Sequence, residues 1–460
     1  MALILCLDVG STWTKGALLS PAGELLGTAQ HPTTPPEVLH GIDAVTDELN
    51  ARGAEVLACS SAGGGLRLAV VGQERLVSSE AGYRVALSAG AKVVHVSAGE
   101  LDGAGVRELR ASRPDLVLLV GGTDGGDTRV LLHNAKRLAA NRIACPVVLA
   151  GNQHARPDAL EVLHAGGRTV VPAANVLPDV GELAPGPARG AIREVFLRHV
   201  IGGKGLSRGP RFQRLVRAVT PDAVLAGVSR LAGQDSEGTV LVVDVGGATT
   251  DVYSTVSAVD DSATERTVAL PPDRRTVEGD LGMRWSAPGV VAEAEAERLV
   301  DRDEAVFLRE QSLSRTSAPD WVPGDTEQAA VDLRLAALAA VLAVRRHLRL
   351  VDGQLGPRGA GVLVLSGGVF RHAPSVAEVE TVLRDDPVLR PVLRTASIVV
   401  DDRYVLAPAG LLAETGRTAA ADRLLAAHLV RTSGGIRGGA PQVGKGLTSG
   451  RQHQPERRRR

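Results

Sequence analysis

A short loop of glycine and hydroxyl residues occurs twice in this chain, and it constrains the fold more than any other feature. The first copy spans residues 8–15 and the second spans residues 244–251. Each copy follows a run of aliphatic residues and leads into a second strand-like segment, so each is predicted to form the turn of a β-hairpin. We therefore expect two lobes that each contribute one such loop.

The composition of both loops suits phosphate binding. A glycine lets backbone N–H groups approach phosphate oxygens closely, and successive N–H groups in a turn form a nest for anions. Hydroxyl side chains and one lysine add further donors. The predicted nucleotide-binding residues are Gly10, Ser11, Thr12, Thr14 and Lys15 in the first loop and Gly246, Gly247, Thr249 and Thr250 in the second.

The aspartate at the start of each loop predicts a divalent metal. Asp8 and Asp244 would repel a phosphate unless a cation lay between them, usually through bound water. They are therefore the candidate catalytic carboxylates, and Mg²⁺ and ATP are the expected cofactors. Lys15 would supply positive charge for the terminal phosphate, whereas Asp251 occupies the matching place in the second loop. The alternative is a pair of ordinary hairpin turns, which rarely carry so many hydroxyl groups.

Two further segments fit a nucleotide site. The aliphatic run 362–365 ends near Gly367 and Gly368, where adjacent glycines would let the backbone lie against a base or ribose. A simple turn before a helix is the alternative. Residues 407–412 offer small side chains on a predicted helix, which would allow close packing where two lobes hinge.

Two acidic runs are each open to two interpretations. In a glycine-rich turn after a predicted strand, Thr123, Asp124 and Asp127 could bind an anion or a metal, or the turn could simply cap a helix with an aspartate. Glu278 and Asp280 are candidate catalytic residues that could orient the attacking water or hold metal. Alternatively, they could fix a loop by accepting backbone hydrogen bonds.

Strand-like and helix-like segments alternate regularly in the first half of the chain, which predicts a parallel sheet covered by helices. Residues 191–230 are predicted to be helical, and past residue 430 the composition turns to Gly, Arg, Gln and Pro, which predicts disorder. The predicted divisions are 1–65 as the first part of lobe I, 66–175 as an inserted or subsidiary α/β domain, 176–239 as the return to lobe I and the crossover, 240–430 as lobe II, and 431–460 as a disordered basic tail.

Composition argues against several classes of partner. Basic and acidic residues balance at 52 each, so no overall field favours nucleic acid. The longest apolar run, residues 335–344, is shorter than the ~20 residues that a membrane span needs, and the N-terminus lacks a signal-peptide pattern. The three cysteines have no metal-type spacing. We expect a cytoplasmic protein with neither a nucleic-acid nor a membrane partner.

The ordered set of two phosphate loops, a glycine pair and a small-residue helix resembles the superfamily of actin, heat-shock chaperone ATPases and sugar kinases. Four runs resemble more closely the glutamate mutase L family, accessory proteins found with cobalamin-dependent glutamate mutase. The resemblance covers residues 3–415, although Trp13 stands where a smaller aromatic is expected. The matching runs are residues 59–67, 121–127, 244–252 and 275–284.

This resemblance implies a two-lobed, actin-like α/β fold of duplicated ribonuclease-H-like domains, with an inserted α/β block. It also implies a chaperone-like role, in which slow ATP hydrolysis helps to reactivate an adenosylcobalamin-dependent mutase, glutamate mutase first, by releasing damaged cobalamin. Two alternatives stay open. The first is a kinase for a small metabolite, and the second is a non-catalytic, actin-like assembly protein.

Overall fold

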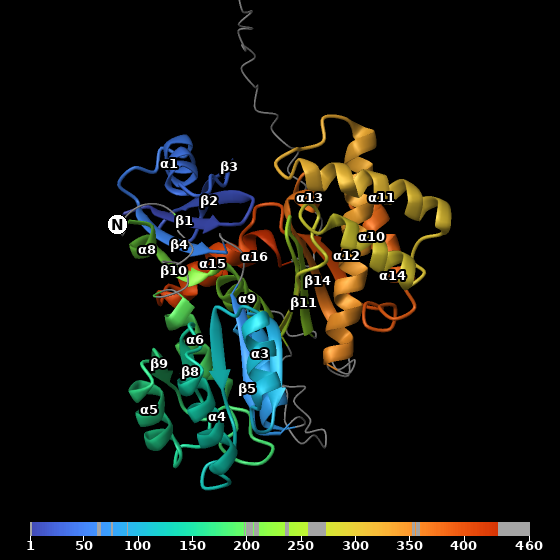
Figure 1. Ribbon diagram of the computed structural model, residues 1–460. Coiled ribbons are helices and arrows are strands. Elements are labelled where there is room, and N and C mark those ends of the chain that lie inside the picture. The colour runs from blue at the N-terminus through green and yellow to red at the C-terminus, as the bar shows by residue number, and fades with distance from the viewer. Residues whose placement is uncertain are drawn as a thin grey trace, which may run out of the picture. The chain divides into compact units, whose positions relative to one another are not determined.

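Three five-stranded sheets form the framework of the computed structural model (Figure 1). They lie in the unit made by residues 1–430; residues 431–460, predicted to be a disordered tail, lie outside the described residues. The structure describes residues 2–61, 66–74, 77–89, 91–196, 198, 206, 211–234, 239–255, 273–351, 355 and 359–430.

The first and second sheets have the same strand order and the same strand directions. Each begins with a three-stranded antiparallel meander and continues with two parallel strands. The first sheet has the order β10-β4-β1-β2-β3, with β1 at Ile4–Val9, β2 at Trp13–Leu19, β3 at Leu25–Pro32, β4 at Glu55–Ser60 and β10 at Val216–Val219. The second has the order β15-β14-β11-β12-β13, with β11 at Thr239–Val245, β12 at Thr250–Thr255, β13 at Asp273–Glu278, β14 at Ala360–Ser366 and β15 at Ser397–Val400. This duplication confirms the predicted actin-like fold class.

The third sheet is wholly parallel, with the order β6-β5-β7-β8-β9. Its central strands β5, β7 and β8 are buried, as expected when helices cover a parallel sheet, whereas the edge strands β6 and β9 are partly exposed. The chain enters this sheet after β4 and returns to the first sheet at β10. Its elements are β5 (Arg67–Gly72), α2 (Ser78–Ser88), β6 (Lys92–Ala98), α3 (Gly103–Ala111), β7 (Leu116–Leu119), α4 (Arg129–Ala140), β8 (Val147–Leu149), α5 (Arg156–Ala165) and β9 (Val170–Pro172).

Most of the remaining helices lie over the first two sheets, directly or through another helix, whereas α6 contacts β8 and β9 of the third sheet. In α12 the residues from Leu335 to Val344 are buried, so the longest apolar run of the sequence forms part of the core of the second lobe. The helices are α1 (Leu39–Glu48), α6 (Pro185–Val195), α8 (Arg211–Leu215), α9 (Thr220–Ala232), α10 (Ala287–Ala296), α11 (Arg302–Ser317), α12 (Thr326–Leu350), α13 (Gly368–Arg371), α14 (Ala377–Asp385), α15 (Leu406–Glu414) and α16 (Thr418–His428).

Two equivalent helices, α9 after β10 and α15 after β15, pack against each other between the sheets. Their contact needs glycine on both sides. A Cβ on Gly410 would lie 1.7 Å from the carbonyl oxygen of Ala223, and a Cβ on Gly227 would lie 2.2 Å from that of Leu406. The predicted close packing of residues 407–412 is therefore confirmed, and the hinge role stays a prediction.

Two local predictions were wrong. Residues 191–230 are not all helical, because they include strand β10, which pairs with β4. A four-residue strand is too short to show the alternation of apolar and polar residues, and β4 lies far away in the sequence. The first loop is also shorter than expected, since β2 begins at Trp13 and includes Thr14 and Lys15.

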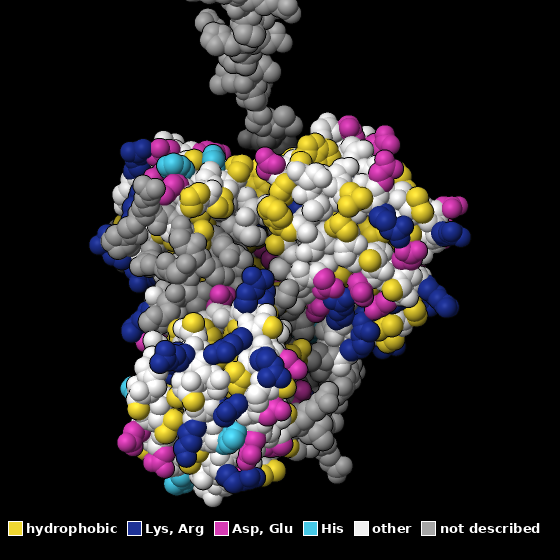
Figure 2. All heavy atoms as spheres, viewed as in Figure 1, with side chains coloured by type: hydrophobic (Ala, Val, Ile, Leu, Met, Phe, Trp, Pro, Cys, Tyr) yellow, Lys and Arg dark blue, Asp and Glu magenta, His cyan; other side chains and the backbone are white. Residues whose placement is uncertain are grey.

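Charged side chains of both signs lie on the surface of the described residues. On the face in Figure 2, basic and acidic side chains are interspersed, in line with the balance of 52 and 52. Within the described ranges, no helix combines the length and apolar character that a membrane span requires.

Candidate functional site

The two predicted loops have the same backbone geometry. The N–H of Gly10 donates to the carbonyl oxygen of Trp13 at 3.0 Å, and the N–H of Gly246 donates to that of Thr249 at 2.9 Å. In both hairpins the aspartate is the second-last residue of the first strand, and it is paired with a residue near the start of the second strand. Asp8 is therefore paired with Lys15 and Asp244 with Asp251.

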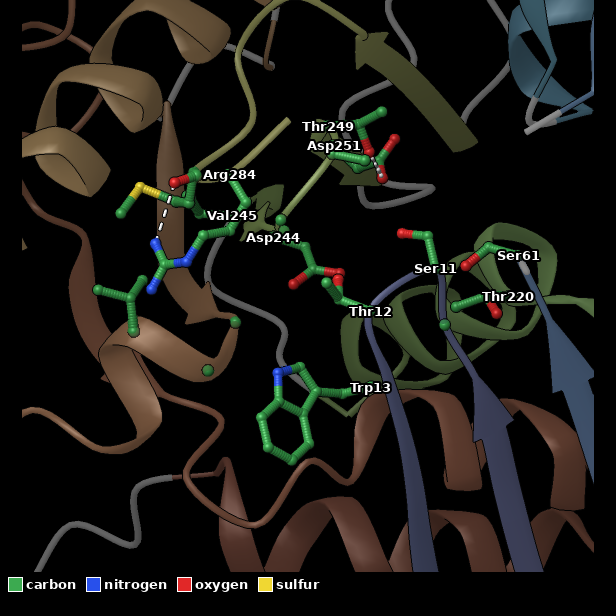
Figure 3. A pocket seen from close by; sticks show the side chains of 18 of the residues that line it. Ser11, Thr12, Trp13, Ser61, Thr220, Asp244, Val245, Thr249, Asp251 and Arg284 are labelled. Carbon is green, nitrogen blue, oxygen red and sulfur yellow. Dashed lines mark hydrogen bonds between the residues drawn. The ribbon is translucent and has the colours of Figure 1, made fainter. Parts of the chain in front are cut away.

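The loops come into contact where the two lobes meet. A Cβ added to Gly247 would lie 2.7 Å from Thr12 Oγ1, so only glycine fits here without moving the other loop. In Figure 3, Thr12 and Asp244 extend toward each other from opposite sheets. A ligand at this point would contact both lobes at once.

Both loops line one cavity of about 1160 Å³. The predicted residues that line it are Asp8, Gly10, Ser11, Thr12, Lys15, Asp244, Gly246, Gly247, Thr249, Gly367 and Gly368. The structure thus brings together most of the nucleotide-binding set that the sequence suggested.

Thr14 and Thr250 are exceptions, because both are fully buried strand residues that do not line the cavity. The hydroxyl of Thr14 is hydrogen-bonded to that of Thr33 at 3.1 Å, and the hydroxyl of Thr250 donates to the carbonyl oxygen of Leu281. Since side chains alternate along a strand, Lys15 faces the cavity and Thr14 faces away. The prediction that these two hydroxyls contact phosphate is not supported by their positions.

Asp8 accepts hydrogen bonds on both carboxylate oxygens. Oδ1 accepts from the Thr220 hydroxyl and, at 3.6 Å, from the Cys59 thiol. Oδ2 accepts from the Tyr404 hydroxyl at 2.5 Å and lies 3.9 Å from Lys15 Nζ, which also lies 3.7 Å from the centre of the Tyr404 ring. Asp8 is therefore held by donors from the first sheet and from the segments that begin α9 and α15.

Asp244 has a different environment although its place in the hairpin is equivalent. Burial raises the pKa of Asp244, and the nearby carboxylates of Asp251 and Asp8 raise it further. Lys15 and a hydrogen bond from the Ser366 hydroxyl act in the opposite direction and lower this pKa. Asp8 and Asp251 thus add negative charge near Asp244, although Asp251 is itself paired with Arg275, and a divalent cation would offset that charge.

The donor set fits Mg²⁺ bound together with phosphate. Among the described residues, no three His, Cys, Asp or Glu side chains are grouped to bind a metal directly. A cation near Asp244 and Asp8 would need oxygens from water and from ligand phosphates, which is how Mg²⁺ usually binds.

The predicted glycine pair lies where β14 ends beside the second loop. Gly367 has φ of 121°, and a Cβ there would lie 2.3 Å from the carbonyl oxygen of Val245, so glycine lets β14 end close against β11. Trp285 and Trp321 line the same cavity. The N–H groups of Arg284 and Trp285 donate to the carbonyl oxygen of Gly247 at 2.8 and 2.9 Å, which ties this aromatic wall to the second loop.

Comparison with known proteins identifies the family. A family model described as MutL protein matches residues 4–429. Protein MutL of Clostridium tetanomorphum is 34% identical over 448 residues, which cover 90% of this chain and 96% of that protein. The chain belongs to the MutL protein family. The family predicted from the sequence is thereby confirmed.

Solved structures resemble this MutL-family chain only weakly. A xylulose kinase from Rhodospirillum rubrum has a TM-score of 0.34 at 14% identity, covering 91% of this chain and 92% of the kinase. A glucokinase from Streptomyces griseus, solved with glucose and AMPPNP, has a TM-score of 0.30 at 12% identity, covering 92% and 98%. Likenesses of this size say nothing about the activity of this chain.

One run that suggested the MutL family contains Glu278 and Asp280, which do not line the cavity. Arg346 of α12 donates to Glu278 at 2.8 Å and to both oxygens of Asp280 at 2.8 and 2.9 Å. The pair fixes the turn after β13, as the second interpretation proposed, but the donor is a guanidinium and not the backbone. Their position gives no support to a catalytic role.

A second MutL-family run contains Thr123, Asp124 and Asp127, which also lie outside the cavity lining. Asp124 accepts from the N–H of Gln153 and from Asn175 at 2.8 and 2.9 Å, and Asp127 accepts from the N–H of Arg129 at the start of α4 at 2.9 Å. These carboxylates are occupied by protein donors, which favours the interpretation as a glycine turn with a helix cap.

Sequence reasoning missed several residues that shape the site. Ser366 directly precedes the glycine pair, so its position could have been found from the run itself. Thr220 and Tyr404 carry no local signal, because each reaches Asp8 from a distant part of the chain.

Proposed function

We propose that this chain is an ATP-binding accessory factor that reactivates an adenosylcobalamin-dependent mutase, with glutamate mutase as the first candidate. The observation that carries the nucleotide part is the contact between Gly247 and Thr12, which brings two phosphate-type loops onto one cavity. The mutase part rests on membership of the MutL family and on the accessory role that the resemblance implies.

In this proposal the phosphate chain lies between the loops. Backbone N–H groups of both glycine turns, the hydroxyls of Ser11, Thr12 and Thr249, and the Lys15 ammonium hold the phosphate oxygens. Mg²⁺, when bound near Asp244 and Asp8, would neutralise phosphate charge as a Lewis acid. The base and ribose lie toward Gly367 and Gly368. Because this arrangement acts by positioning and not through a strong base, we expect slow hydrolysis.

Nucleotide exchange would then change how the lobes meet. A triphosphate contacts both loops at once, whereas the diphosphate loses the group that bridges them, so the two ligands have different contacts with the two arrangements. The closely packed helices α9 and α15 are the natural pivot. The third sheet and its helices, inserted between β4 and β10, would present or withdraw a mutase-binding surface.

A reconstitution experiment tests this function. Glutamate mutase is first inactivated until it retains cyanocobalamin, and then the wild-type chain, ATP, Mg²⁺ and fresh coenzyme are added. We expect mutase activity to return with ATP but not with a non-hydrolysable analogue alone. Asp244→Asn should fail, and Asp303→Asn, a change of an exposed aspartate in α11 of the second lobe, should behave like wild type.

The main rival is a small-metabolite kinase, and the same experiment separates the two. If the mutase stays inactive at equimolar factor while ATP is consumed and a metabolite becomes phosphorylated, the reactivation proposal is wrong. ATP hydrolysis without either product would favour the assembly protein, which sedimentation in the presence of ATP would then reveal.

A further inference from the structure

The family run 275–284 begins with an arginine that the proposed nucleotide site does not use. Arg275 lies on β13 and lines the cavity, yet only 3% of its surface is exposed. On the same face of the second sheet, Asp251 and Tyr253 of the neighbouring strand also line the cavity.

The guanidinium of Arg275 is only partly satisfied by the protein. Its Nη2 donates to Asp251 Oδ1 at 2.8 Å, and its Cζ lies 5.4 Å from the centre of the Tyr253 ring. Nε and Nη1 are buried and have no hydrogen-bond partner within the part of the chain that the structure describes. A guanidinium carries five N–H donors, and buried donors in proteins are nearly always paired. Arg275 therefore has donors that no described residue satisfies.

Neighbouring charges do not supply that partner. Arg193 of α6 also lines the cavity, and it is engaged with Glu414 at 2.5 Å and with Asp222 at 3.8 Å. Asp222 attracts both arginines, but burial raises the pKa of Asp222 to about 6, so its negative charge is poorly stabilised there. Arg275 keeps its unused donors despite these carboxylates.

The cavity also has an apolar wall formed by elements on either side of the inserted block. Leu66, Ile192, Phe196 and Val219 line it, together with the hydroxyl residues Ser60, Ser61 and Thr220. Single-ligand pockets usually measure about 300–1,000 Å³. At about 1160 Å³ the cavity exceeds this range, so it has room for a second ligand beside a nucleotide.

We propose that Arg275 binds the oxyanion of a second, partly apolar ligand, a carboxylate or a phosphate ester, whose apolar body packs against Ile192 and Phe196. The unpaired nitrogens, the apolar wall and the volume of the cavity carry this assignment. This proposal depends on the proposed function in one respect, which is that a nucleotide occupies the rest of the cavity.

Calorimetry on the full chain tests the site with two probes, benzoate and inorganic phosphate. Each probe is titrated into protein saturated with AMPPNP and Mg²⁺. We expect the wild type to bind at least one probe, Arg275→Gln to weaken that binding at least ~10-fold, and Arg275→Lys to retain part of it, since a lysine keeps the charge without the planar fork. Which probe binds tells a carboxylate from a phosphate ligand.

Arg67→Gln is the matched control, because Arg67 lines the same cavity but donates to the backbone oxygens of Arg113 and Ser112 at 3.1 and 2.7 Å. This variant should bind the probes like wild type. If Arg275→Gln does not fold, the comparison of Arg275→Lys with wild type decides.

Three results would overturn the proposal: no binding of either probe to wild type, unchanged binding in a folded Arg275 variant, or weakened binding of AMPPNP but not of ADP. The last result would assign Arg275 to the terminal phosphate of the nucleotide. A wild type that binds the probes but not AMPPNP would instead contradict the nucleotide proposal and leave the Arg275 site standing.

Discussion

Asp8 and Asp244 occupy equivalent positions in two equivalent hairpins, but their surroundings assign them different tasks. Asp8 is 4% exposed and accepts from Thr220 and Tyr404 while Lys15 lies close by. Asp244 is only half-buried, lies near like charges and carries a raised pKa. The first carboxylate contributes to stability, whereas the second is kept at a cost that a bound cation would offset.

Substitution of the two aspartates should therefore separate activity from stability. Asp8→Asn and Asp244→Asn should each reduce ATP hydrolysis by at least ~100-fold, because phosphate positioning is lost. Without ligand at pH 7, Asp8→Asn should lower Tm, since four donors lose their anion. Asp244→Asn should raise it. The pKa of Asp244 is higher in the folded chain than the value of about 4 in the unfolded chain, so ionisation of Asp244 above pH 4 destabilises the fold. Asparagine carries no charge and removes this cost.

Steady-state hydrolysis assays and thermal melts of both variants check this prediction, with Asp303→Asn as the control. Wild-type hydrolysis in either variant would show that its aspartate is only a turn residue. A lower Tm for Asp244→Asn would mean that its hydrogen bond from Ser366 outweighs the repulsion.

Tyr404 connects the second lobe to the first through its hydroxyl. It precedes α15 and adopts φ of 55°, a conformation uncommon for a large side chain. Tyr404→Phe keeps the ring under Lys15 but removes the donor to Asp8, and we expect a loss of about 1.5–3 kcal/mol in the free energy of unfolding. Urea denaturation measures this loss, with Tyr83→Phe on α2 as the control. Equal midpoints for Tyr404→Phe and wild type would show that the bond contributes nothing.

At the scale of elements, a buried histidine joins α12 to the second sheet. His347 is hydrogen-bonded to Ser254 at 2.8 Å and to Thr276 at 3.1 Å, and burial lowers its pKa to about 3. Below pH 6.5 the unfolded chain takes up a proton that the folded chain does not, so this residue should reduce stability progressively as the pH falls from about 6.5 toward 3. Stability should be greatest above that range.

Urea denaturation at pH 7 and pH 5 checks the histidine prediction. His347→Gln should be less stable than wild type at pH 7 but should lose less stability between the two pH values. If both proteins lose the same amount, other groups account for the acid sensitivity.

The contact between α9 and α15 gives the sharpest test of packing. Gly410→Ala places a Cβ 1.7 Å from a backbone oxygen, which a side-chain movement cannot relieve, so we expect a loss of at least ~1–3 kcal/mol. Gly190→Ala is the matched control, because Gly190 lies on helix α6 with nothing within 4 Å. It should be neutral or slightly stabilising, since alanine favours helix more than glycine. Thermal melts of both variants give the comparison.

The features found from the sequence are those encoded over short spans. Both hairpin loops can be predicted because an aliphatic run, an aspartate and a glycine follow one another directly in the sequence. The alternation of strands and helices in the third sheet is likewise visible over short spans. β10, Thr220, Tyr404 and Arg275 were not assigned roles, because their partners lie far along the chain. Only the folded chain brings Tyr404 to Asp8, so no local pattern could predict that contact.

At the scale of the whole molecule, the division predicted at residues 66–175 stays a proposal, although the third sheet spans Arg67 to Pro172. Its helix α2 contacts β13 of the second sheet, so the block has neighbours in both lobes. Limited proteolysis with and without AMPPNP tests whether it moves. We expect cleavage near its ends to change with nucleotide, and identical patterns would argue against coupling.

The chain leaves the first sheet at β4 and rejoins it at β10, and these two strands are adjacent in that sheet. The two connections of the block therefore start from neighbouring strands, which is the arrangement that tolerates insertion of a whole domain. An ancestral five-stranded sheet could have gained the block in one genetic event without disturbing either hairpin. Under the proposed function, such an insertion would let the partner-binding block change while the two nucleotide-binding loops stay the same.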